Sequence, residues 1–265
     1  MTKPSRVSGL SAGTRLRTAA ELLLHARLAD LHAAEARALR RFDPDAVHDL
    51  RVACRRVRAA IKVFGKKRLR SLDERVEHLQ DVLGEVRDVQ LRIGWLERHH
   101  ADPRAARAKL GLAKAHLRKA LALWTRRSEV LLLREAVHVH GHGRLGGSRV
   151  RQRLRKRTRD LRRELSRAGR LEPAAAHRIR IAAKKLRYEA ELLDDAFDLG
   201  DAVEALSDAQ SALGDLHDAD VRLSEVGRDR RLAKAARAER RRSAIKARAA
   251  LRRLGRVLTE LEERV

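Results

Sequence analysis

Residues 46–64 read AVHDLRVACRRVRAAIKVF, and residues 175–193 repeat the pattern as AAHRIRIAAKKLRYEAELL. On a helix that turns about 100° per residue, the apolar positions of each copy share one face. We therefore expect two amphipathic helices, termed here the signature helices, whose apolar faces belong to a core. These faces comprise Val47, Leu50, Cys54, Val57, Ile61 and Phe64 in the first copy and Ala176, Ile179, Ala183, Leu186, Ala190 and Leu193 in the second.

A row of basic residues flanks each apolar face, roughly 110° around the helix. A solvated surface would explain one such row, although aligned like charges cost about 0.2–0.5 kcal/mol per pair. Both copies keep the cations in the same register with the apolar face, so we interpret the rows as anion-binding. The last basic position is lost in the second copy, where Glu191 stands. The candidate binding residues are His48, Arg51, Arg55, Arg56, Arg58 and Lys62, then His177, Arg180, Lys184, Lys185 and Arg187.

The composition favours helices. The chain has 265 residues, of which 43% are hydrophobic and 2% aromatic, with four prolines. Ala, Leu, Arg and Glu dominate, and because these residues form helices more readily than strands, we expect an all-α fold. The formal net charge of +26 attracts polyanions over long range. Cys54 is the single cysteine, so no intrachain disulfide is possible, and we expect it to be buried.

No segment has the pattern of a membrane span or an export signal. The first 13 residues lack the apolar stretch of a signal peptide. No run approaches the ~20 apolar residues of a membrane helix. We therefore expect a soluble, cytoplasmic chain without a membrane partner.

Cap residues indicate where helices begin and end. Asp43 followed by Pro44 is typical of a helix start, and Gly65 is typical of an end. Ser71 and Glu74 have the spacing of a capping box that would open the next helix. Before these, a first helix is expected over residues 12–41, and its inner side is expected to include Leu16, Ala20, Leu23, Leu24, Leu28, Leu31 and Leu39.

The same signals divide the chain into domains. We expect a disordered N-terminus at residues 1–11 and a four-helix repeat at residues 12–137. The segment HVHGHGRLGG, residues 138–147, breaks every periodicity and is predicted to be a linker. A second four-helix repeat, capped by Ser148, is expected over residues 148–265.

A second repeated element supports this duplication. Residues 83–89, LGEVRDV, match residues 213–219, LGDLHDA, at an offset of 130, against 129 for the signature helices. Two agreeing offsets indicate a duplicated four-helix unit, and each unit is long enough for a bundle with short connections.

These motifs resemble those of the CHAD family, the histidine-containing α-helical domain. The first signature helix, from Val47 through Arg58, is similar to the family's first motif, and the second, from His177 through Tyr188, is similar to its second. The resemblance covers nearly the whole chain. It implies two pseudo-twofold-related four-helix bundles in one compact domain, with the signature helices facing a shared basic groove.

The resemblance also implies a function. CHAD domains bind inorganic polyphosphate and have no catalytic activity, so we expect a polyphosphate-binding protein without a cofactor, associated with polyphosphate granules. No triphosphatase motif of the kind often fused to CHAD domains is found, since Glu260 and Glu262 lie in a helical tail. We therefore expect a stand-alone domain with unequal halves, because Glu191 replaces one cation.

The roles of the histidines stay open at this stage. His48 and His177 lie near helix starts, where they could donate to phosphate or pack against a carboxylate such as Asp88 or Asp218. We expect Asp88 and Asp218, together with Glu85 and Asp215, to orient the arginines rather than to catalyse.

Other functions are disfavoured by specific features. His48 and Asp49 suggest a metal-dependent phosphohydrolase, but Arg178 follows His177, so the second copy lacks the aspartate. A metal held by His138, His140 and His142 lacks an adjacent Cys or acidic ligand.

Nonspecific nucleic-acid binding through the same rows and the helix at residues 151–170 is the main alternative. Scarce aromatic residues weigh against it, because single strands need stacking platforms. A scaffold role on phosphate-rich granules is compatible with polyphosphate binding.

Overall fold

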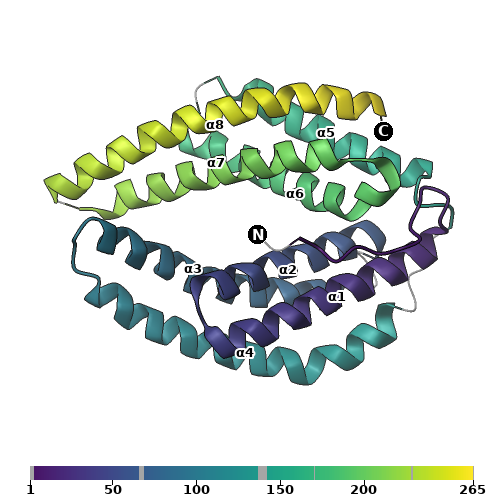
Figure 1. The fold of residues 1–265 in the computed structure, drawn as a ribbon, viewed down its shortest axis with the longest axis horizontal. Helices are drawn as coiled ribbons and strands as arrows, with labels where there is room; N and C mark the ends of the chain where they lie inside the picture. Colours follow the sequence, from purple (N-terminus) through teal and green to yellow (C-terminus); the bar gives the residue numbers. More distant parts are fainter. Residues whose placement is uncertain (1–2, 66–68, 137–141, 170, 228, 265) are drawn as a thin grey trace. The chain divides into compact units, whose positions relative to one another are not determined.

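The computed structural model describes residues 3–65, 69–136, 142–169, 171–227 and 229–264 (Figure 1). In these residues the backbone forms eight α-helices and no strand, which confirms the all-α fold. The helices are α1 (Leu16–Arg41), α2 (Pro44–Phe64), α3 (Arg70–Arg98), α4 (Arg104–Ala136), α5 (Ser148–Arg167), α6 (Pro173–Phe197), α7 (Gly200–Glu225) and α8 (Arg230–Arg264).

The chain separates into two compact units, Met1–Leu145 with α1 to α4 and Gly146–Val265 with α5 to α8. Consecutive helices of each unit run in alternating directions (Figure 1). In the first unit α1 packs against α2 and α4, and α3 packs against α2 and α4. In the second unit α5 packs against α6 and α8, and α7 packs against α6 and α8. Each unit is therefore a four-helix bundle closed into a ring, as the duplication predicted.

The apolar faces of the signature helices lie in the cores of their units. In α2, Val47, Leu50 and Ile61 are 0% exposed, and in α6, Ile179 and Leu186 are 0% exposed. Burying a side chain of this size contributes about 1.5–3 kcal/mol. The predicted helical register of both copies is confirmed.

The ends of α2 follow the predicted cap chemistry. Asp43 is the N-cap, and its Oδ1 accepts a hydrogen bond from the backbone N of Ala46 at 2.8 Å. Pro44 takes the first helical position, where its missing N–H leaves no bond unmade. Gly65 is the C-cap, with its N bonded to the carbonyl of Ile61.

Three local predictions are wrong. α3 begins at Arg70, so Ser71 lies inside the helix and the capping box does not form; Glu74 instead accepts from Arg70 at 2.8 Å. The residue before α3 is Leu69, which is 0% exposed, so its burial fixes the helix entry in place of a polar cap. Leu39 is 48% exposed rather than inward, and the N-cap of α5 is Gly147 rather than Ser148.

The segment before α1 contacts the first bundle. Ser5 donates through its Oγ to Asp30 Oδ1 at 2.5 Å, and its carbonyl accepts from Arg27. Nearer the helix, the N of Leu145 bonds to Thr14 O at 2.8 Å. Residues 143–145 of the predicted linker therefore lie against the start of α1, which begins at Leu16 rather than near residue 12.

Candidate functional site

The basic row of α2 lies at the edge of the buried face. Its five predicted members are partly exposed: His48, Arg51, Arg55, Arg58 and Lys62. The periodicity explains this position, because residues about 110° from the core-facing direction lie at the border between neighbouring helices and solvent. Arg56, which we also predicted, is only 6% exposed and is therefore buried.

Carboxylates of α3 meet the middle of this row. Arg58 donates through Nε to Asp73 at 2.7 Å and through Nη2 to Glu77 at 2.6 Å. Burial alone lowers the pKa of Arg58, but the hydrogen bonds that it donates to Asp73 and Glu77 outweigh this effect and raise the pKa. Arg58 is therefore held charged, and two anionic groups offset its charge at the surface.

Arg51 lies over the glycine of the repeated Leu-Gly element. A Cβ on Gly84 would stand 3.5 Å from Arg51 Nη2, an ordinary contact distance, so the guanidinium packs directly on α3. Arg51 Nη1 lies 3.9 Å from Asp88 Oδ1. Asp88 therefore lies beside Arg51, where an orienting role was expected, whereas Glu85 pairs with His116 at 3.1 Å instead.

His48 lies beside Arg87 of α3. Burial lowers the pKa of His48, and the positive charge of Arg87 lowers it further, against an opposing effect of Asp49. Arg87 itself donates from Nη1 to the carbonyl of Pro44 at 3.3 Å, which places it at the start of α2. Among the described residues no carboxylate hydrogen-bonds the His48 ring, and its lowered pKa favours the neutral form at pH 7.

The basic row of α6 has the same position in the second unit. His177 and Lys185 are exposed, while Arg180 and Lys184 are partly exposed. Pro173 occupies the first helical position, so the row begins in the first turns of the helix.

A second histidine accompanies His177. The ring of His217 on α7 lies with its centroid 6.1 Å from that of His177. Burial lowers the pKa of His217, and the charge of Arg180 lowers it further. His217 occupies the position that Arg87 has in the first unit. Our sequence interpretation missed Arg87 and His217 as site residues, although the repeated Leu-Gly element contains both.

Arg187 has a different environment from its counterpart Arg58. It is 1% exposed, bonds to Glu191 on its own helix and donates through Nε to Gln210 at 2.9 Å. Its guanidinium carbon also lies 4.2 Å from the centroid of the Tyr188 ring. Of the predicted residues, the structure therefore brings His177, Arg180, Lys184 and Lys185 to the surface of α6, but not Arg187.

A cavity of about 440 Å³ adjoins the row of α6. It lies between α5 and α6, and its basic lining residues are Arg157, Arg163, Arg167, His177, Arg178 and Lys185. Asp160 and Glu164 offset part of this charge. The α5 arginines are functional candidates that our polyphosphate-site residues did not include, although the helix at residues 151–170 was named for the nucleic-acid alternative because of its density of arginine.

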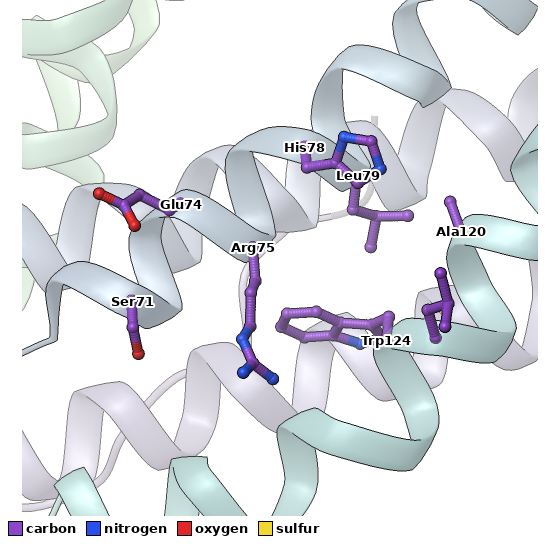
Figure 2. Close-up of a pocket in the computed structure, with 8 residues that line it drawn as sticks. Ser71, Glu74, Arg75, His78, Leu79, Ala120 and Trp124 are labelled. Carbon is purple, nitrogen blue, oxygen red and sulfur yellow. The ribbon is translucent and has the colours of Figure 1, made fainter.

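A second cavity, of about 430 Å³, lies between α3 and α4 (Figure 2). Figure 2 shows Arg75 pointing from α3 toward Trp124 on α4. Leu79, Ala120 and Leu123 supply much of the remaining wall. None of the predicted binding residues lines this cavity, so it is separate from the basic rows.

The described residues contain no group of three or more His, Cys, Asp or Glu side chains placed to hold a metal ion. Asp49, next to His48, lies 3.4 Å from Arg37. The predicted linker histidines His138 and His140 lie outside the described residues. Among the described helices, none combines the length and apolar character needed to cross a membrane.

The fold and the site define an all-helical domain made of a duplicated bundle, with one basic helix edge in each copy. The family model of the CHAD domain matches residues 22–227, and the chain belongs to this family. CHAD domains are binding-type domains associated with polyphosphate, in agreement with the resemblance found in the signature helices.

Two solved structures share this fold. The crystal structure of the CHAD domain from the plant Ricinus communis is 21% identical, with a TM-score of 0.70, and the match covers 95% of this chain and 96% of that one. PptA from Streptomyces chartreusis is 15% identical, with a TM-score of 0.59, and the match covers 93% of this chain and 100% of that one. No curated protein matches the chain.

Proposed function

We propose that this protein binds inorganic polyphosphate through the basic rows of α2 and α6. The observation that carries the proposal is that both signature helices keep cations on an accessible edge at equivalent positions of the repeat. His48, Arg51 and Arg55 on α2 correspond to His177, Arg180 and Lys184 on α6, and all six are at least partly exposed.

The spacing of the row fits a linear polyanion. At ~1.5 Å rise per residue, the row from His48 to Lys62 extends about 21 Å. Arginine holds phosphate oxygens with a planar fork, and lysine acts as a mobile point charge. Each phosphate bound along the row releases counterions, so affinity rises with chain length and falls with salt. No cofactor is needed.

The contacting residues are the exposed subset of the predicted ones. On α2 they are His48, Arg51, Arg55, Arg58 and Lys62; on α6 they are His177, Arg180, Lys184 and Lys185. Arg56 and Arg187 are buried and are not among the contacting residues.

The histidines donate hydrogen bonds to phosphate. Burial and Arg87 lower the pKa of His48 in the free protein. A phosphate oxygen beside the ring stabilises its protonated form, because an opposite charge favours the charged state. Replacing both signature histidines, as His48→Gln and His177→Gln, should weaken the pH dependence of binding. Unchanged pH dependence would contradict this role.

Polyphosphate binding would bring the protein to polyphosphate granules in the cytoplasm. There its exposed helices would remain available to proteins, so a scaffold role is compatible with this function. Localisation of the fluorescently tagged chain, compared in cells with and without polyphosphate, tests this part of the proposal.

A competition titration tests the proposal against the nucleic-acid alternative. Labelled long-chain polyphosphate is bound to the full chain at near-physiological salt. It is then displaced with unlabelled polyphosphate, duplex DNA or single-stranded RNA at equal total phosphate. We expect polyphosphate to compete best. Displacement by either nucleic acid at a tenfold lower phosphate concentration would overturn the proposal.

A further inference from the structure

A second basic surface lies on α8, which is outside the matched part of the family model because that match ends at residue 227. Two of its arginines serve the bundle: Arg240 pairs with Asp220 at 2.6 Å, and Arg253 pairs with Glu204 at 2.9 Å. The outward cations of α8 are exposed and form no ion pair with a described residue. They are Arg230, Lys234, Arg237, Arg241, Arg242, Lys246, Arg248, Arg252 and Arg256.

Helix α5 extends this surface. Arg162 of α5 pairs with Glu262 of α8, which marks the side of each helix that borders the other. By helical periodicity, Arg155 and Arg159 lie within roughly 60° of Arg162 around α5. In the same way, the α8 residues Arg241, Arg248 and Arg252 lie within roughly 80° of Glu262. We term the outward cations of α8, together with Arg155 and Arg159, the α5–α8 face.

The α5–α8 face is distinct from the row of α6. In the second unit α5 packs against α6 and α8, and α7 packs against the same two helices. Helices α6 and α8 are therefore at opposite corners of the bundle, and their outward sides point in different directions.

Few carboxylates border this face along α5 and over residues 230–256 of α8, and the exposed Glu260 and Glu263 follow only at the C-terminal end of α8. The acidic residues in the described parts of residues 149–167 and 230–256 are Asp160, Glu164 and Glu239, and each is partly buried. They form ion pairs with Arg163 at 3.8 Å, Arg178 at 3.0 Å and Arg222 at 3.0 Å, respectively. Neither α5 nor α8 contains an aromatic residue. The face can thus attract phosphates but has no ring on which a single strand could stack.

We propose that the α5–α8 face binds double-stranded nucleic acid through its two phosphate backbones, independently of sequence. The unpaired cations cover roughly half the circumference of α8, from Arg237 round to Lys246. One linear polyanion would contact a single row of these cations. The two strands of a duplex, which border its groove, would instead contact both flanks of a helix inserted in that groove. From Lys234 to Arg256 the helix extends about 33 Å, close to one turn of duplex DNA.

The inference does not rest on polyphosphate binding, because it uses other residues. The test compares three full-length proteins: wild type, a face variant and a control. The face variant carries Arg237→Gln, Arg241→Gln, Arg248→Gln and Arg252→Gln. The control removes the same charge from exposed positions of the first unit, by Arg40→Gln, Arg41→Gln, Lys109→Gln and Lys119→Gln. Circular dichroism verifies that all three are folded.

Fluorescence anisotropy measures binding to a random-sequence 20-base-pair DNA duplex and to long-chain polyphosphate at 0.15 M salt. Each lost phosphate contact reduces the salt slope by about 0.9, so four contacts account for up to roughly a thousandfold in affinity. We expect the face variant to bind duplex at least thirtyfold more weakly, the control to change less than fivefold, and polyphosphate binding to change less than fivefold in both. Equal losses of duplex binding in face variant and control would show that net charge alone acts and would overturn the inference. A loss confined to polyphosphate would overturn it as well.

Discussion

Replacing Glu77 by Gln should tighten polyphosphate binding. Glu77 is the more exposed of the two carboxylates that hold Arg58: its side chain is 50% exposed, against 21% for Asp73. The exchange removes one negative charge beside the row of α2 and frees Nη2 of Arg58 for a phosphate oxygen. Arg58 stays in place because its Nε still donates to Asp73 at 2.7 Å.

The size of the gain follows from counterion release. One added phosphate contact raises the salt slope by about 0.7 for a single-stranded polyanion, which corresponds to roughly fourfold tighter binding at 0.15 M salt. This is about 0.8 kcal/mol. The fold should lose less than about 1 kcal/mol, since the Arg58–Glu77 pair is partly solvent-exposed. Fluorescence anisotropy with end-labelled long-chain polyphosphate measures the affinity, and urea unfolding measures the stability.

Glu97→Gln is the matched control. Glu97 pairs with Arg107 at 2.6 Å, the same distance as Glu77 to Arg58, and its side chain is 46% exposed, but it lies at the far end of α3 near α4. The control changes the net charge equally and should alter affinity less than twofold. Equal tightening in the two variants, or no tightening with Glu77→Gln, would refute the assignment of Arg58 to the site.

Three further predictions concern protonation, reactivity and stability. Burial and the charge of Arg87 lower the pKa of His48, and burial and the charge of Arg180 lower the pKa of His217. A bound phosphate raises both pKa values. The affinity for polyphosphate should therefore be greatest below the pKa values of the free protein and should decline as pH rises through the pKa values of the complex. Calorimetry in buffers of different ionisation enthalpy should show proton uptake on binding, and absence of uptake at pH 6.5 would contradict this. Burial raises the pKa of Cys54 to about 12, so a thiol reagent at pH 8 should label the protein only in denaturant, as read by mass spectrometry, and rapid labelling of the native form would exclude a buried thiol. Arg187→Ala leaves Glu191 buried without its arginine and should cost on the order of 3 kcal/mol in urea unfolding, whereas Arg55→Ala should cost less than about 0.5 kcal/mol; similar costs would contradict the difference in burial.

The repeated apolar pattern was sufficient to predict the bundles. Burial of Val47, Leu50 and Ile61 depends only on the helical period, which the sequence shows directly. The start of α2 was predictable for a similar reason, because Asp43 caps a helix through contacts within four residues.

Features that depend on distant residues were not predictable. Leu69 is buried in the bundle, so α3 begins at Arg70 and the predicted capping box at Ser71 does not form. Arg58 and Arg187 have equivalent positions in the repeat, yet one reaches the surface and the other turns inward to Gln210. Glu191, four residues after Arg187, was a local signal for that difference, but the contact with Gln210 on the next helix required the structure.

The most direct test of polyphosphate binding is the affinity of a variant with four exposed row residues removed, Arg51→Ala, Arg55→Ala, Arg180→Ala and Lys184→Ala. Its Kd for long-chain polyphosphate at 0.15 M salt is compared with that of the control lacking Arg40, Arg41, Lys109 and Lys119, after circular dichroism shows both to be folded. Four lost contacts at a slope of about 0.7 each predict roughly two-hundredfold weaker binding, against less than fivefold for the control. If both variants lose affinity equally, the rows on α2 and α6 are not the binding site.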